Sequence, residues 1–535
     1  MIAISSLWSA PTINPINHKA RSIPVFNPIN KYGRVFFFSW FGFFIAFWSW
    51  YAFTPLLSLT IRQNLDLTTE QIANTNIAAL TGTLLVRFVA GPLCDKFGPR
   101  WTYIMILLAG SIPTAMAGLV NNWQGLLALR FFVGILGGSF VPCQVWSTGF
   151  FDKNVVGSSN ALIGGWGNAG GGITYFLMPV IYDSKCHQPR SNELPGKGQL
   201  TCVAGLREDQ GLTSNVAWRV AFIVPFILIV STAAGMLFLC DDTPTGKWSE
   251  RHAAAQQIQQ ERLVDVPTTP SDRSVHSNEK KEEKNSTTDL EHHPNTPDIQ
   301  TGQVLDAAQH EIIVAPTLRT TLHILTSRQT LFHCATYACS FGGELAINSY
   351  VGAYYLKNFP SLGQTGAGRW AAMFGLLNVI TCPLGGIIAD ILYKYTSSLW
   401  IKKLWIVFVG IVSGAFLIAI GLTDPMEESM MFGLIAGMAV FLKAGNGANF
   451  ALVPHVHPQA NGVLSGIVGA VGNLGGVVYA IVFRYHGTDY AESFWITGVM
   501  IIGLNFDLVL GEACAKGAGW GEMMRFICCL IRGCL

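Results

Sequence analysis

A short turn of the form G-x-x-x-D occurs twice in the chain, ending at Asp95 and again at Asp390. Eight positions before each aspartate stands a different residue, Arg87 in the first copy and Cys382 in the second. The guanidinium of an arginine in an apolar stretch keeps its charge and offers several hydrogen-bond donors, which suits it to binding an anion. If the two halves were built to present a pair of such arginines, the second one is missing.

Each half of the chain also carries an asparagine inside a glycine cluster. Asn168 lies in GGWGNAGGG and Asn473 in VGNLGGV, each with a pair of glycines two residues later. Glycines at this density allow helix backbones to approach closely in a membrane. The asparagines are open to two interpretations. They face a shared cavity as amide donors for a small oxyanion, or they form hydrogen bonds between helices.

The composition is typical of a helical membrane protein, since half of the 535 residues are hydrophobic and only 12% are charged. Twelve apolar runs are each close to the roughly 20 residues that a helix needs to cross the hydrocarbon core. They cover residues 35–58, 73–93, 102–120, 125–146, 157–181, 218–240, 328–357, 369–391, 402–423, 430–454, 462–484 and 490–510. We therefore predict an all-α membrane protein with twelve transmembrane helices in two pseudo-symmetric six-helix bundles, residues 35–240 and 326–511.

Basic residues predict the orientation. They gather before the first predicted span and after the second and eighth, which places the N-terminal segment 1–34 and both termini in the cytoplasm. The sequence begins without a basic region that leads into an apolar one, so no cleavable signal peptide is expected. A plasma-membrane protein with many passes is predicted.

Residues 241–325 interrupt the apolar pattern with charged residues, proline, serine and threonine, which predicts a largely disordered cytoplasmic loop. Whether its serines and threonines are phosphorylated or the loop is a plain tether is left open. A disulfide between Cys186 and Cys202 in an outward loop is also left open. Near the end, Asp507 and Glu512 interrupt the last apolar run, so we expect a short or poorly seated twelfth helix and an atypical cytoplasmic tail over 512–535.

The internal duplication and the segments LLVRFVAGPLCDKFGPR, GGWGNAGGG, KAGNGANFALVPHV and GIVGAVGNLGGVVYA resemble the nitrate/nitrite porter family of the major facilitator superfamily, especially its fungal members. The resemblance implies a major facilitator fold with an anion site at mid-membrane between the halves. It also implies alternating access and, in eukaryotic members, proton symport.

The family's binding residues can be transferred where this sequence matches. The family's second-helix arginine corresponds to Arg87, its signature asparagines to Asn168 and Asn473, and its seventh-helix aromatic pair to Tyr337 and Phe341. Phe140 and Phe47 are weaker candidates, because aromatic side chains in such helices more often serve packing. The family's eighth-helix arginine is replaced here by Cys382, so this chain departs from the family as well as from its own repeat.

The loss of that arginine predicts a weaker anion site. Removing one charge-assisted hydrogen bond costs about 1.5–3 kcal/mol, roughly a 10- to 150-fold loss of affinity. Glu344, Lys443 and Arg130 also lie inside predicted spans. Glu344 is interpreted as a counter-ion, a proton-coupling group or a solvated helix-end residue, whereas Lys443 and Arg130 are expected to snorkel or to brace helix packing.

These features together predict a transporter that moves nitrate, and nitrite, into the cell with protons. The partners are the anion, protons and the lipid bilayer, with no nucleic acid and no cofactor or metal, and a monomer is expected. A non-transporting nitrate sensor or a degenerate paralogue is the alternative, because Cys382 could abolish transport. An enzyme is not expected, since no phosphate loop, nucleophile elbow or metal constellation is present in the sequence.

Overall fold

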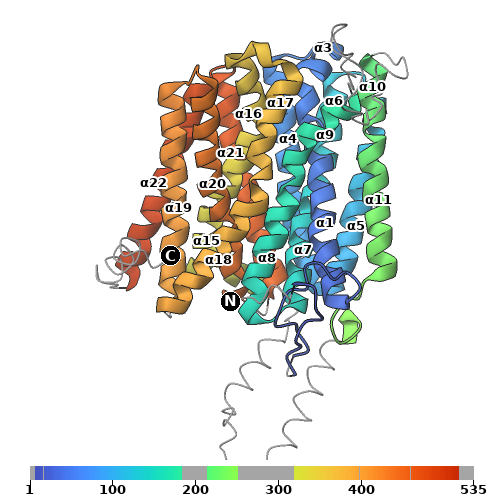
Figure 1. Cartoon of the computed structure of the whole chain (residues 1–535), viewed down its shortest axis with the longest axis vertical. Helices are drawn as coiled ribbons and strands as arrows, with labels where there is room; N and C mark the ends of the chain where they lie inside the picture. Colours follow the sequence, from blue (N-terminus) through green and yellow to red (C-terminus); the bar gives the residue numbers. More distant parts are fainter. Residues whose placement is uncertain are drawn as a thin grey trace, which may run out of the picture.

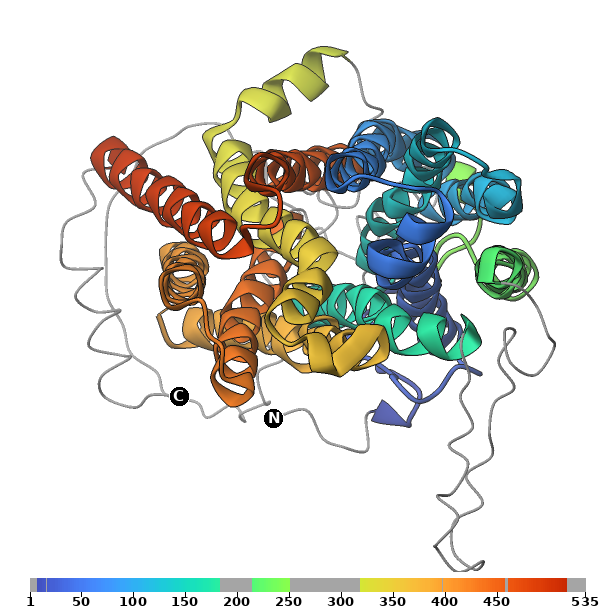
Figure 2. The same ribbon diagram turned by 90° about the horizontal axis from the view of Figure 1, so that it is seen from above.

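The protein is an elongated bundle of helices in the computed structural model, and two groups of helices stand side by side in it (Figures 1 and 2). The structure describes residues 7–15, 17–182, 214–250, 318–396, 398–457 and 460–516. The possible disulfide cysteines Cys186 and Cys202, the tail from residue 517 and most of the central loop lie outside these described residues.

The first half contains the helices of the blue-to-green group. They are α1 (Lys31–Tyr51), α2 (Thr54–Leu56), α3 (Arg62–Asn64), α4 (Thr69–Phe97), α5 (Pro99–Ala115), α6 (Trp123–Val133), α7 (Phe140–Phe150), α8 (Lys153–Asn168), α9 (Gly170–Tyr182), α10 (Ser214–Ala221) and α11 (Ile223–Leu239). The short π-helix η2 (Leu57–Ile61) and 3₁₀-helix η4 (Gly134–Ser139) continue α2 and α6.

The second half contains the yellow-to-red group. Its helices are α14 (Leu318–Thr326), α15 (Arg328–Tyr337), α16 (Gly343–Asn358), α17 (Gly363–Leu376), α18 (Asn378–Thr396), α19 (Leu399–Thr423), α20 (Glu428–Leu452), α21 (Asn461–His486) and α22 (Tyr490–Lys516). A π-helix, η6 (Ala338–Gly342), joins α15 to α16.

All twelve predicted spans coincide with helical segments. Nine helices of the described residues are long and apolar enough to cross a membrane. The other three predicted spans fall on the broken pair α8 and α9, on α15 with α16, and on α22. The last of these differs from the prediction, because α22 continues through Asp507 and Glu512 to Lys516. A helix tolerates single acidic residues where they do not disturb its backbone hydrogen bonds.

The two halves meet along α4 with α21, and along α8 and α9 with α18 and α17. Glycines allow these contacts. An added Cβ on Gly91 would lie 2.6 Å from the carbonyl oxygen of Gly462, and one on Gly172 would lie 2.6 Å from the carbonyl carbon of Gly375. The glycine clusters therefore do serve close packing between helices, as their density predicts.

At the lower end of the bundle, where α1 begins in Figure 1, the first G-x-x-x-D turn contacts the second half. The Asp95 carboxylate accepts hydrogen bonds from the backbone N–H groups of Gly462 and Val463 at 3.1 and 3.0 Å. These N–H groups lie in the first turn of α21, where the helix dipole favours an anion. Asp95 thus joins the first half to the second.

Both ends of the predicted central loop are folded within the described residues. Asp242 forms an ion pair with Arg100 at 2.9 Å, and the ring of Trp248 covers Gly98 at the end of α4. At the other end, residues 318–326 form helix α14. Residues 241–250 and 318–325 of the predicted loop therefore belong to the described part of the chain.

Candidate anion-binding site

Arg87 lies on α4 with its side chain fully buried where the two halves meet. Its Nε donates to the carbonyl oxygen of Gly137 at 2.9 Å, and its Nη1 donates to that of Gly469 on α21 at 3.1 Å. Nη2 is also buried and has no hydrogen-bond partner among the described residues. A buried polar nitrogen without a partner is costly, and a bound anion would supply the missing acceptor.

Aromatic rings enclose the Arg87 guanidinium. Its central carbon lies 4.8 Å from the ring centre of Phe140 and 4.9 Å from that of Phe341. Tyr337 stacks on Phe341 at 4.9 Å, and the ring of Phe47 lies 6.4 Å from that of Phe341. The structure thus brings together all four aromatic residues that the sequence suggested, around the predicted arginine.

Local irregularities of the helices position these groups. Phe341 lies in the π-helix η6, directly after Tyr337 ends α15, and Gly137 lies in the 3₁₀-helix η4. A π-helical or 3₁₀ turn inside a longer helix often marks a functional site, because it shifts side chains and carbonyls out of the regular register. Gly469 lacks a Cβ that would sit 3.2 Å from Cδ of Arg87, so a larger residue there would crowd the arginine.

The two signature asparagines are buried, and each has a side-chain oxygen without a hydrogen-bond partner among the described residues. Nδ2 of Asn473 donates to the carbonyl oxygen of Gly469 at 2.9 Å. One N–H of this amide is therefore used by a backbone carbonyl of its own helix, the same carbonyl that accepts from Arg87. Asn168 stands at the break between α8 and α9, beside Gly167, whose Cβ position lies 1.9 Å from Cδ1 of Phe43.

Cys382 is buried on α18 and its Sγ lies 3.5 Å from the carbonyl oxygen of Ala161 on α8. Its backbone packs against α20, because a Cβ on Gly447 would lie 1.8 Å from the carbonyl oxygen of Cys382. The cysteine thus fills the contact between helices of both halves.

A second polar cluster surrounds Glu344, and sequence reasoning did not find it. Nζ of Lys443 lies 2.7 Å from Oε1 of Glu344, in an ion pair that is almost completely buried. Nδ2 of Asn378 donates to Oε1 and Nδ2 of Asn446 donates to Oε2, both at 2.5 Å. The Lys443 Nζ also lies 4.0 Å from the ring centre of Phe374. Lys443 therefore does not snorkel, and Glu344 is a counter-ion rather than a solvated residue.

Tyr337 connects the two clusters. Arg87, Glu344 and Cys382 are all near its side chain. Lys443 and Cys382 are also near each other. The Glu344 cluster therefore adjoins the position from which the repeat has lost an arginine.

The charged side chains of the Arg87 and Glu344 clusters together leave a net positive charge. Glu344 and Lys443 neutralise each other, whereas Arg87 forms no ion pair with a carboxylate in the part of the chain that the structure describes. An isolated charge at the bilayer centre costs about 3 kcal/mol on insertion scales. A single negative charge beside Arg87 would balance the region, which makes it suited to a small monovalent anion.

Comparisons with known proteins agree with this architecture. The sequence profile described as Major Facilitator Superfamily matches residues 39–480. A solved structure of the proton:xylose symporter XylE has a TM-score of 0.57 at 11% identity and covers 88% of this chain and 94% of its own, which shows the shared fold.

Relatives with named substrates are similar over most of their length. Elsinochrome transporter 1 of Elsinoe fawcettii is 35% identical, with 94% of this chain and 97% of the relative covered. High-affinity nitrate transporter 2.3 of Oryza sativa subsp. japonica is 30% identical, with 91% and 78% covered. The nitrate/nitrite transporter NrtP of Nostoc punctiforme is 27% identical, with 87% and 89% covered. The chain is a membrane transporter that belongs to the major facilitator superfamily and, within it, to the nitrate/nitrite porter family.

Proposed function

We propose that the chain carries nitrate, and nitrite, across the plasma membrane into the cell by alternating access, and that Arg87 binds the anion. One observation carries this proposal. Arg87 is fully buried between the halves, and among the described residues one of its nitrogens lacks a partner and no carboxylate neutralises it. A site at the midplane between two repeats is where such transporters bind substrate.

The surroundings of Arg87 favour a small anion. The rings of Phe140 and Phe341 stand on the guanidinium, and Phe450 closes on Phe140 with ring centres 4.6 Å apart. This dense aromatic enclosure limits the size of the ligand. It also excludes water, and an ionic hydrogen bond is stronger where water is excluded.

Lys443 is proposed to supply the second positive charge in place of the arginine that Cys382 replaces. Lys443 lies one turn before Gly447, which packs against the carbonyl oxygen of Cys382, so its ammonium reaches the same region from α20 instead of α18. While Glu344 is ionised, it neutralises Lys443. Protonation of Glu344 would leave Lys443 free to attract an anion.

Proton coupling follows from this arrangement as a hypothesis. A proton on Glu344 and an anion beside Lys443 and Arg87 would bind together, because protonation of Glu344 leaves Lys443 without its counter-charge and the anion then supplies one. Release of the proton to the cytoplasm would restore the Glu344–Lys443 pair and displace the anion. The orientation with cytoplasmic termini and a monomeric state belong to the same proposal.

The substrate of the elsinochrome transporter is the second candidate. That relative is 35% identical over almost both full lengths, and the missing eighth-helix arginine weakens the case for nitrate. The small aromatic enclosure around Arg87 is the feature that favours nitrate over a larger organic solute.

Uptake of isotope-labelled nitrate tests the proposal directly. The full chain is expressed in cells that lack their own nitrate carriers, and uptake is compared with that of cells without it at acidic and at neutral external pH. Uptake that saturates and is faster at acidic pH is expected. Absence of nitrate and nitrite uptake by a chain that reaches the plasma membrane, together with transport of elsinochrome, would assign the second candidate instead.

A further inference from the structure

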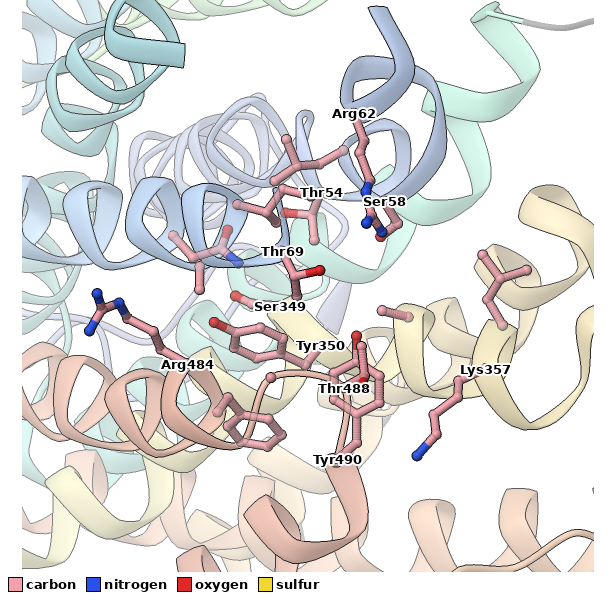
Figure 3. Close-up of a pocket in the computed structure, with 18 residues that line it drawn as sticks. Thr54, Ser58, Arg62, Thr69, Ser349, Tyr350, Lys357, Arg484, Thr488 and Tyr490 are labelled. Atoms are coloured by element: carbon pink, nitrogen blue, oxygen red, sulfur yellow. The ribbon is translucent and has the colours of Figure 1, made fainter. Parts of the chain in front are cut away.

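A pocket of about 220 Å³ opens between the two halves at the upper end of the bundle, where α3 lies in Figure 1. Figure 3 shows its lining, which comes from α2, η2, α3 and α4 of the first half and from α16, α21 and α22 of the second. The Asp95 contact between the halves lies at the opposite end of the bundle.

The side chains of the pocket give it a positive character. Arg62, Lys357 and Arg484 line it, and none of its described lining residues is acidic. Arg484 forms an ion pair with Glu70, which leaves Arg62 and Lys357 as the cations without an ion-pair partner among the described residues. Focused positive potential of this kind raises the local concentration of anions.

Two residues at the inner part of the pocket lead to a buried arginine. Oδ1 of Asn76 accepts a hydrogen bond from Nη1 of Arg130, which also donates to Oγ1 of Thr75 at 3.0 Å. Asn76 and Tyr350 both line the pocket. Arg130 is 1% exposed, it is near Tyr350, and it has no carboxylate partner among the described residues.

The buried side chain of Arg130 is not fully hydrogen-bonded. Nη2 of Arg130 is buried and has no hydrogen-bond partner in the described part of the chain, and the buried hydroxyl of Tyr350 lies near the side chain of Asn76, which also accepts from Arg130. The two groups come from different halves, α6 and α16. An arginine that only braced α4 and α6 would need the bonds of Nη1 alone, whereas an unpartnered Nη2 beside a hydroxyl from the opposite half is suited to an anion.

We propose that Arg130 and Tyr350 form an outer site for a small monovalent oxyanion, which the anion occupies before it reaches Arg87. Asn76 and Arg87 are eleven residues apart on α4, which separates the two positions by about 16 Å along the helix. The buried Tyr51 is near both arginines, and its hydroxyl lies near the side chain of Asn348. The outer site rests on the proposed function for the identity of its anion.

Equilibrium binding of labelled nitrate to the purified full-length chain tests the outer site separately from the inner one. Wild type is expected to bind two nitrates per chain, and Arg87→Ala is expected to keep one. The double variant Arg87→Ala with Arg130→Gln is expected to bind none. Arg369→Gln serves as the control, because Arg369 is an exposed arginine of α17.

Tyr350→Phe covers the case in which Arg130→Gln does not fold, since it keeps the ring and removes only the hydroxyl. In the Arg87→Ala background it is expected to weaken the remaining nitrate site about 10-fold. In uptake assays, Tyr350→Phe alone is expected to raise KM with little change in kcat. If wild type binds one nitrate and Arg87→Ala binds none, the outer site is wrong while the proposed function stands. If wild type binds no nitrate, the proposed function itself is contradicted.

Discussion

Arg87 and Asn473 donate to the same carbonyl oxygen, that of Gly469, at 3.1 and 2.9 Å. The arginine comes from the second predicted span and the asparagine from the eleventh, so this shared acceptor ties the charged group of one half to the signature residue of the other. An anion that draws Arg87 toward itself must loosen or rotate this contact. Anion binding at Arg87 is therefore expected to change how α21 packs against α4.

Loss of the Asn473 amide is expected to reduce nitrate transport by more than the loss of an equivalent helix-packing contact would. We expect Asn473→Ala to lower nitrate uptake about 10-fold, because Gly469 then depends on Arg87 as its sole side-chain donor among the described residues. Asn505→Ala is the matched control, since Nδ2 of Asn505 makes the same type of bond to the carbonyl of Ile501 at 2.8 Å on α22. Equal losses of uptake in both variants at equal surface expression would show that only helix packing is involved.

Because Glu344 and Lys443 form a buried ion pair, removing one charge is expected to cost much more stability than removing both. Lys443→Met is expected to destabilise the fold by about 3–5 kcal/mol, because it leaves a buried carboxylate without its counter-charge. Lys443→Met with Glu344→Gln should recover most of that stability. Thermal unfolding of the purified variants measures both, and a double variant no more stable than Lys443→Met would argue against the pair.

The single variant Glu344→Gln tests whether Glu344 couples nitrate transport to protons. Glutamine can still accept from Asn378 or Asn446, but it cannot lose a proton. We expect nitrate uptake by this variant to lose its dependence on external pH while nitrate binding persists, since Lys443 is then permanently free of its counter-charge. An unchanged pH dependence of uptake would place the proton-coupling group elsewhere.

A combined variant tests whether Lys443 takes the place of the arginine that is absent at position 382. Cys382→Arg alone would place a guanidinium beside the Lys443 ammonium, and two like charges in this buried region repel. Cys382→Arg with Lys443→Met and Glu344→Gln should transport nitrate with a lower KM than Cys382→Arg alone. If Cys382→Arg alone transports nitrate with the same KM as the combined variant, Lys443 does not act as the second cation.

The hydrogen bonds of Asp95 predict a change in the access equilibrium. Asp95→Asn removes the charge that faces the first turn of α21, which should weaken closure of the lower end by about 1 kcal/mol. Cys94, fully buried beside it, should then react faster with a membrane-permeant thiol reagent. Asp390→Asn is the comparison, because the hydrogen bond that Asp390 makes to the other half is a long one, from Ser158 at 3.5 Å, and the variant should change the Cys94 rate less. Equal rates in wild type and Asp95→Asn would contradict the closing role.

Hydropathy could predict the spans, because it reflects local constraints, and the resemblance to the family suggested the grouping of Arg87 with its aromatic neighbours. They could not predict the partner of Glu344, since Lys443 is 99 residues away and on a different helix. They also could not predict the bond from Asn473 to the carbonyl oxygen of Gly469, because it depends on the rotamer within a packed helix. The extent of α22 was missed for a related reason: acidic residues in a sequence do not show whether the backbone around them stays helical.

The central claim is that nitrate binds at Arg87, and nitrate uptake by Arg87 variants tests it most directly. Wild type, Arg87→Lys, Arg87→Ala and the exposed-arginine control Arg369→Ala are compared in cells that lack other nitrate carriers, normalised to surface expression. We predict that Arg87→Ala lowers apparent nitrate affinity by about 10- to 150-fold, that Arg87→Lys retains part of it, and that the control matches wild type. Uptake by Arg87→Ala that equals uptake by the control would contradict the account.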